Sequence, residues 1–71
     1  MNQSMDEIKK MATREGFLDV YWSRLQKNRL SGGYASMREI YDQMEKEFRQ
    51  EYGTLLFPSF SAFRKYLYRH H

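Results

Sequence analysis

The single proline of the chain, Pro58, limits where its last helix can begin. Proline cannot sit inside a helix, and it pushes the residue before it toward an extended conformation. Ser59 follows directly, and its hydroxyl can accept a hydrogen bond from a free backbone N–H of the next turn. The sequence therefore predicts a helix over residues 60–69 that begins at a serine cap.

The apolar side chains of this predicted helix fall on one side. Phe60, Phe63 and Leu67 are spaced i, i+3 and i+7, which is the spacing of one buried stripe. The other side carries serine, arginine, lysine and tyrosine, and no acidic residue follows Glu51. A short helix with an aromatic inner side and a cationic, hydroxyl-bearing outer side has the chemistry to enter a DNA groove.

Serine–glutamate pairs and glycines mark the limits of the earlier helices. Ser4 with Glu7, and Ser36 with Glu39, have the S-x-x-E form of a capping box, in which the two side chains satisfy exposed N–H groups. Glycine is a natural helix stop. The predicted helices cover about residues 5–15, 17–30 and 37–52, and end at Gly16, Ser31–Gly33 and Gly53.

The core must be built from aromatic side chains. The chain has 71 residues and no cysteine, so neither disulfides nor thiolate metal sites can support it. Trp22, with Leu18 and Leu25 at i−4 and i+3, is its predicted centre. We expect one all-α domain over residues 1–71, a small three- to four-helix arrangement of helix-turn-helix type. Residues 1–15 hold few large apolar side chains and are expected to pack loosely.

Charge is distributed unevenly along the chain, whose net charge is +3. Residues 1–35 hold six Lys/Arg against four Asp/Glu, residues 36–52 three against five, and residues 53–71 three against none. An acidic middle between two basic ends predicts one face suited to an anion and another turned away from it. Ordinary solvated surface charge is the alternative interpretation of the same pattern.

The sequence contains no catalytic constellation. His70 and His71 are adjacent, so on a helix they would point about 100° apart and form a poor metal site; they also fit a remnant of a purification tag. No glycine-rich phosphate loop follows a strand. No apolar run approaches the roughly 20 residues that span a bilayer. We therefore expect a cytoplasmic protein that is not an enzyme and has neither metal nor cofactor.

Capped helices followed by a basic last helix predict a helix-turn-helix domain whose last helix lies in the major groove of double-stranded DNA. The residues expected to contact bases are Ser61, Ala62, Arg64, Lys65 and Tyr68. The residues expected to contact the DNA backbone are Ser36, Arg38, Arg24, Lys27, Asn28, Tyr34, Ser59 and Arg69.

Two runs of the second half carry a resemblance, SMREIYDQM at residues 36–44 and FPSFSAFRKYL at residues 57–67. They resemble helix-turn-helix segments of small DNA-binding proteins encoded by plasmids, phages and transposons, over about residues 34–68. The resemblance implies sequence-specific DNA binding in transcription regulation or mobile-element maintenance, often as a homodimer on paired half-sites. The chain departs from the usual motif in the length of the connector, which exceeds a three- or four-residue turn.

Two other functions remain open. A protein-interaction module, such as a phage-type inhibitor or an adaptor, would present an exposed apolar patch to its partner. The residues available for such a patch are Leu55, Leu56 and Phe57 of the connector and Met5, Ile8 and Met11 near the N-terminus. RNA binding would use Tyr66, Tyr68 and Arg69, which could stack on unpaired bases.

Overall fold

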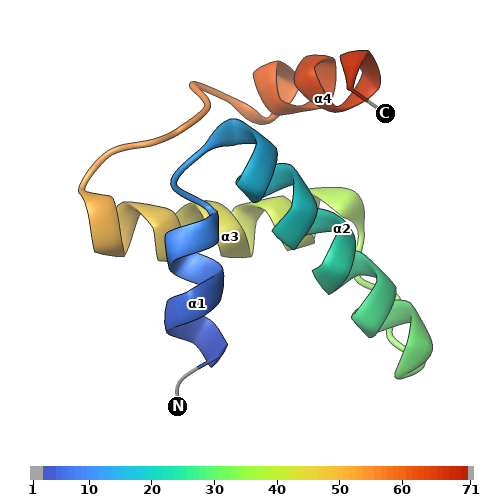
Figure 1. The fold of residues 1–71 in the computed structure, drawn as a ribbon. Coiled ribbons are helices and arrows are strands. Elements are labelled where there is room, and N and C mark those ends of the chain that lie inside the picture. The colour runs from blue at the N-terminus through green and yellow to red at the C-terminus, as the bar shows by residue number, and fades with distance from the viewer. Residues whose placement is uncertain (1–2, 71) are drawn as a thin grey trace.

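The computed structural model describes residues 3–70, with side chains from Asp6 onward. The described residues form four helices and no strand, in the order α1 (Gln3–Lys10), α2 (Arg14–Leu30), α3 (Met37–Tyr52) and α4 (Phe60–Arg69) (Figure 1). The predicted all-α class is confirmed, and the predicted ranges 37–52 and 60–69 agree with α3 and α4. None of the helices described is both long and apolar enough to cross a membrane.

The ends of α3 and α4 are set by local capping. Ser36 Oγ accepts the N–H of Glu39 at 3.1 Å, and Ser59 Oγ accepts the N–H of Ala62 at 3.2 Å. Gly53 ends α3 with a φ of 71°, a left-handed conformation that glycine adopts without strain. The predicted serine caps at positions 36 and 59 and the predicted glycine stop are confirmed; of the capping box of Ser36 with Glu39, the hydrogen bond to the serine hydroxyl is confirmed. They leave residues 53–59 as the connector between the two helices.

The first break in the helical chain lies before Gly16, not at it. Thr13 caps α2, and its hydroxyl accepts the N–H of Gly16 at 3.0 Å. Gly16 is buried in the first turn of α2, where a Cβ would overlap the carbonyl oxygen of Lys10. Glycine is needed here because α1 and α2 approach closely, not because a helix ends. The predicted boundary between ranges 5–15 and 17–30 is therefore wrong.

Aromatic rings from three helices and the connector meet around Phe63 of α4. Phe63 is fully buried, and its ring centroid lies 4.9 Å from that of Tyr21, 5.0 Å from Tyr41, 5.3 Å from Phe57 and 5.5 Å from Phe17. These separations fall in the range where aromatic pairs attract one another beyond simple burial. Phe63 is thus the anchor that holds α4 on the rest of the domain.

Tyr21, rather than Trp22, occupies the centre of α2's buried side. Tyr21 is 0% exposed, whereas Trp22 is partly buried and lies edge-on to it, 5.3 Å away between ring centroids. The prediction for Trp22 is wrong because the buried side of α2 runs through Phe17 and Tyr21 and leaves Trp22 at its edge. Burial raises the pKa of the Tyr21 hydroxyl, and that hydroxyl has no hydrogen-bond partner in the described part of the chain.

The N-terminal helix is tied down more firmly than its composition predicts. Met11, which follows α1, is fully buried, and Ile8 packs against the core. The hydroxyl of Tyr52 donates a hydrogen bond to the carbonyl oxygen of Ile8 at 2.8 Å. Because α1 begins at Gln3, Ser4 does not stand at the cap position that the predicted capping box requires. Contacts with α2 and with the end of α3 hold this helix.

In Figure 1, α4 lies on one side of the molecule, across the first turns of α2, and α1 lies on the opposite side. The connector runs along the edge from the end of α3 to the start of α4. One side of α4 is therefore covered by the core, and its other side is left open.

We expect Tyr21→Phe to stabilise the domain. The substitution keeps the ring and removes a buried hydroxyl without a partner, and leaving such a group unsatisfied costs about 1–3 kcal/mol. The midpoint of thermal or urea unfolding at pH 7 should therefore rise. Tyr34→Phe is the matched control, because Tyr34 is 96% exposed, and its midpoint should not change. A loss of stability in Tyr21→Phe would contradict the unsatisfied hydroxyl.

The same substitution should alter the response to alkali. The unfolded chain releases the tyrosine proton near pH 10, whereas the raised pKa of Tyr21 keeps that proton in the folded state. The unfolded state then binds fewer protons, so the free energy of unfolding falls as pH rises above about 10. Urea unfolding at pH 9 and pH 11 should show a smaller fall in Tyr21→Phe than in the wild type.

Candidate nucleic-acid interface

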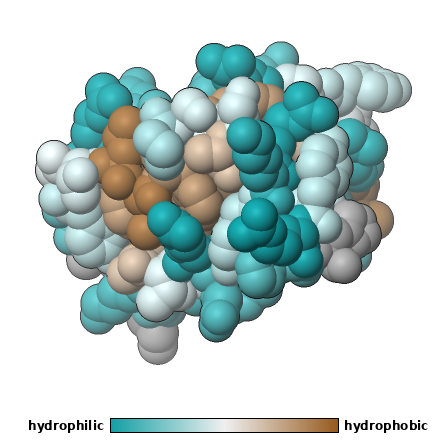
Figure 2. All heavy atoms as spheres, turned by 90° about the horizontal axis from the view of Figure 1, so that it is seen from above, coloured by the Kyte–Doolittle hydropathy of each residue, from teal (hydrophilic) through white to brown (hydrophobic). Residues whose placement is uncertain are grey.

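The outer side of α4 is exposed and carries no acidic residue. Phe63 and Leu67 are buried, and Phe60 and Tyr66 are half-buried beside them. The exposed residues of the helix are Ser61, Arg64, Lys65, Tyr68 and Arg69. Figure 2 looks onto the side where Figure 1 draws α4, and shows hydrophilic side chains across its middle and an apolar area toward one edge.

Two arginines from different helices converge on the ring of Phe60. The guanidinium of Arg38, from the first turn of α3, lies 5.1 Å from the ring centroid, and that of Arg64 lies 5.9 Å from it. Both distances are within cation–π range. Arg38 also pairs with Asp42, Nε to Oδ1 at 3.2 Å, but this pair is exposed and worth little in water. A predicted backbone contact thus lies next to a predicted base contact.

Arg64 is oriented by its neighbour one turn along. Its Nη2 donates to the hydroxyl of Tyr68 at 2.8 Å, and its guanidinium lies 5.5 Å from the centroid of that ring. The hydrogen bond to Tyr68 raises the pKa of Arg64, which is exposed and charged. No carboxylate of the described residues lies within ion-pair distance of Arg64 or Lys65. Both charges are therefore available to an external anion.

The residues predicted to contact DNA around the loop between α2 and α3 differ in how free their polar groups are. Tyr34 projects into solvent and is fully available. Ser36 uses its hydroxyl oxygen as an acceptor in the cap of α3 and keeps its own O–H as a donor. Asn28 supports the loop, because its Oδ1 accepts the N–H of Ala35 at 3.1 Å and its side chain lies against Gly33. A DNA phosphate would accept from Nδ2 of Asn28, which this hydrogen bond does not use, so the predicted backbone contact of Asn28 stays a prediction.

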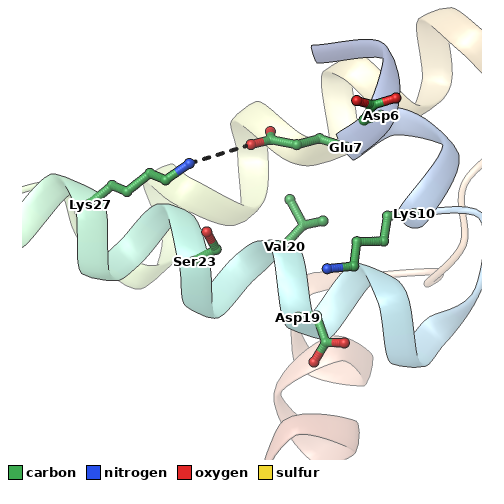
Figure 3. Close-up of a pocket in the computed structure, with 7 residues that line it drawn as sticks. All are labelled: Asp6, Glu7, Lys10, Asp19, Val20, Ser23 and Lys27. Carbon is green, nitrogen blue, oxygen red and sulfur yellow. Dashed lines mark ion pairs between the residues drawn. The ribbon is translucent and has the colours of Figure 1, made fainter. Parts of the chain in front are cut away.

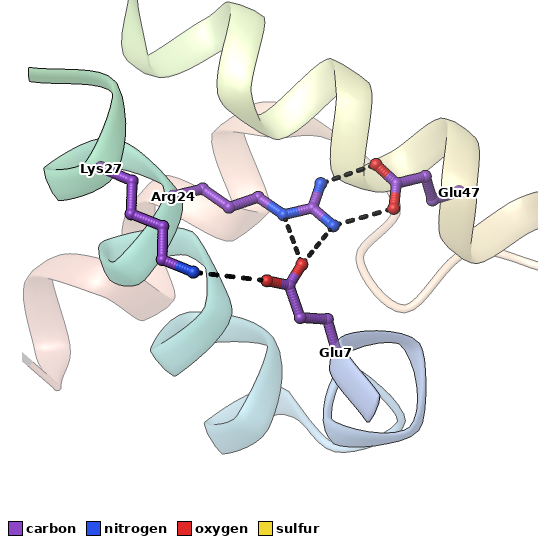
Figure 4. Close-up of polar contacts among 4 residues, drawn as sticks. All are labelled: Glu7, Arg24, Lys27 and Glu47. Atoms are coloured by element: carbon purple, nitrogen blue, oxygen red, sulfur yellow. Dashed lines mark hydrogen bonds and ion pairs between the residues drawn. The ribbon is translucent and has the colours of Figure 1, made fainter. Parts of the chain in front are cut away.

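Arg24 is already held by two carboxylates. Its guanidinium donates to Glu47 at 2.6 and 2.8 Å, and to Oε2 of Glu7 at 2.8 and 3.1 Å (Figure 4). The hydrogen bond to Glu47, more than any other contact, raises the pKa of Arg24, whose side chain is only 15% exposed. The predicted phosphate contact does not fit this geometry, because the ion pairs use Arg24 to join α1, α2 and α3.

Lys27 lies on a different surface from α4. It lines a hollow between α1 and α2 together with acidic residues of both helices, and its Nζ lies 4.0 Å from Oε1 of Glu7 (Figure 3). None of the residues that line this hollow belongs to α4. Lys27, which was predicted to contact the DNA backbone, is therefore not part of the surface that α4 presents.

His70 stacks on Tyr66, with 4.2 Å between ring centroids, and His71 lies outside the described residues. Within residues 3–70, no three histidine, aspartate or glutamate side chains gather in a group that could hold a metal ion.

Arg14 is the functional candidate that the sequence reasoning missed. It is the first residue of α2, yet its guanidinium lies 5.5 Å from the centroid of Phe57, and it lines a hollow together with Lys65 and Arg69. Thr13 is a local signal for a helix that starts at Arg14. No local signal indicates that this helix start packs against α4.

Comparisons with protein-family models, curated proteins and solved structures find no match for this chain. The function must therefore be inferred from the exposed face of α4 and the residues around it.

We expect Arg24→Gln to lower the free energy of unfolding by about 2 kcal/mol. The substitution takes away the cation that Glu7 and Glu47 share, and hydrogen bonds to charged groups contribute about 1.5–3 kcal/mol. Lys27→Gln removes the same charge from an exposed side chain of the same helix, and should cost less than about 0.5 kcal/mol. Urea denaturation of both variants makes the comparison. Equal losses would show that Arg24 does not join the three helices.

Proposed function

We propose that the domain binds double-stranded DNA by placing the outer side of α4 in the major groove. One observation carries the proposal: α4, anchored by buried Phe63 and Leu67, presents Arg64 and Lys65 without a carboxylate partner in the described part of the chain. An α-helix with its side chains is about 10–12 Å wide, which matches a major groove about 12 Å wide.

The exposed residues of α4 supply the base contacts in this proposal. Arg64 uses one Nη2 hydrogen for Tyr68, and its other N–H donors stay free for a bidentate contact with guanine O6 and N7. Lys65 and Ser61 are exposed and offer an ammonium and a hydroxyl to base edges. Ala62 is half-buried, so only part of its methyl group can contact DNA, and the contact proposed for it is with a thymine methyl.

The start of α3 supplies a phosphate contact beside the groove. Arg38 and Tyr41 both approach Phe60, at 5.1 and 5.3 Å from its ring centroid, so the first turns of α3 and α4 lie together. Free N–H groups at a helix start carry partial positive charge and favour a phosphate. Arg38 adds a full charge, and the O–H groups of Ser36 and Ser59 add donors.

The resemblance of residues 36–44 and 57–67 to helix-turn-helix proteins supports a role in transcription regulation or mobile-element maintenance. The chain would then act as a non-catalytic DNA-binding domain, with a homodimer as the form that occupies paired half-sites. The connector of residues 53–59 is longer than the three- or four-residue turn of the usual motif, so the angle at which α4 meets the duplex would differ from that of the motif.

The protein-interaction alternative has less support from the predicted apolar patches. Phe57 is only 3% exposed, because its ring packs between those of Phe17 and Phe63, and Met11 is fully buried. Leu55 and Leu56 are half-buried. Of the residues predicted for these patches, Leu55, Leu56 and Ile8 remain partly exposed, and the side chain of Met5 lies outside the described residues.

Two double variants with equal loss of charge test the proposal. Arg64→Ala with Lys65→Ala removes both cations from the outer side of α4, and should weaken binding to a preferred duplex at least tenfold, since one good base contact is worth about 1–3 kcal/mol. Lys9→Ala with Lys27→Ala removes two exposed cations from the surface of α1 and α2, and should change affinity less than threefold. Fluorescence anisotropy with a labelled duplex measures both.

The controls make the outcome decisive. Thermal unfolding should confirm that all variants are folded, and single-stranded RNA of equal length should compete poorly with the duplex. If the two double variants bind the duplex equally well, α4 does not enter the groove. Tighter binding of the RNA would instead support stacking of unpaired bases on the aromatic residues of α4.

A further inference from the structure

A second group of cations lies on the flank of α4 that faces the start of α2. There, a hollow of about 310 Å³ is lined by the charged side chains of Arg14, Lys65 and Arg69 and by the rings of Phe57 and Tyr66. Lys65 and Arg69 are one turn apart on α4, whereas Arg14 comes from the other end of the chain. Folding thus assembles three cations that no sequence motif groups together.

The rings beneath the hollow restrain Arg14. Its guanidinium lies 5.5 Å from the centroid of Phe57, which in turn lies 5.5 Å from the centroid of Tyr66. Phe57 is buried among the core rings, so it is a fixed support for the cation above it. Arg14 is exposed, and its contact with Phe57 favours this position of the guanidinium before any ligand arrives.

The charges of the hollow are not balanced by the protein. None of its lining residues is acidic, and no carboxylate of residues 6–70 forms an ion pair with Arg14, Lys65 or Arg69. Three cations around one hollow repel one another, and an anion between them relieves that repulsion. The planar guanidinium groups of Arg14 and Arg69 match the oxygen pairs of a phosphate.

We infer that this hollow is a second phosphate site, in which Arg14 and Arg69 bind two adjacent phosphates of the DNA strand opposite to the strand contacted by Arg38, while Lys65 stays available to base edges. The inference rests on the proposed function, because a helix in the major groove has a phosphate backbone on each side. Arg38 lies on the α3 flank of α4, and Arg14 lies on the α2 flank. The two flanks together hold α4 between the strands and set its depth in the groove.

The test measures how duplex affinity depends on salt. Each phosphate contact contributes about 0.9 to the slope of log K against log salt concentration. Arg14→Gln and Arg69→Gln should each reduce the slope by about 0.9 and weaken all duplex sequences alike, and Arg14→Lys, which keeps the charge, should retain the slope. Arg14→Gln combined with Arg38→Gln should reduce it by about 1.8, because the two residues contact separate phosphates. Lys9→Gln with Lys27→Gln is the control and should leave it unchanged.

The outcomes separate this inference from the proposal on which it rests. If the wild type binds duplex DNA and neither Arg14→Gln nor Arg69→Gln changes the slope, the second phosphate site is overturned and the groove assignment of α4 stands. If the wild type shows no salt-dependent duplex binding, both are overturned. If Arg14→Gln proves unfolded by circular dichroism, Arg69→Gln decides, because Arg69 is exposed at the end of α4 and contributes nothing to the core.

Discussion

The position of α4 depends on the contact between Phe63 and the four rings around it. These rings come from α2, α3 and the connector, so one side chain joins the last helix to three other parts of the chain. Their edge-to-face and tilted arrangements resist sliding, because aromatic pairs favour particular relative orientations. Because Phe63 and Leu67 point inward, the helical period places the side chains of Ser61, Arg64, Lys65 and Tyr68 on the exposed side.

The fold also decides which charges remain free. Arg24 lies between Glu7 and Glu47, and Lys27 lies 4.0 Å from Glu7, so these two carboxylates meet two cations at the junction of α1, α2 and α3, away from α4. The cations at positions 14, 64, 65 and 69 receive no such partner in the described part of the chain. A modest net charge of +3 thus includes a separate group of cations around α4 that have no carboxylate partner among the described residues. That separation, more than the total, would attract a polyanion.

Sequence reasoning succeeded where the controlling signal was local and failed where it was tertiary. Ser36, Gly53 and the Pro58–Ser59 pair act on their own turns, and so the bounds of α3 and α4 could be predicted. The role of Gly16 was predicted wrongly because it depends on Lys10, which lies in another helix. The role of Arg24 was missed because its two partners, Glu7 and Glu47, lie far away in the sequence. Trp22 and Tyr21 are adjacent on one wide stripe, and only the rotation of α2 against its neighbours selects between them.

The buried and the exposed residues of α4 can change independently in evolution. Exposed substitutions usually change stability by no more than about 0.5 kcal/mol, whereas removal of a buried aromatic ring costs about 3–5 kcal/mol. Positions 61, 64, 65 and 68 can therefore be randomised in a selection library while Phe63 and Leu67 are kept. Relatives of this domain that recognise different targets would be expected to diverge on one side of a single short helix and to retain its inner rings.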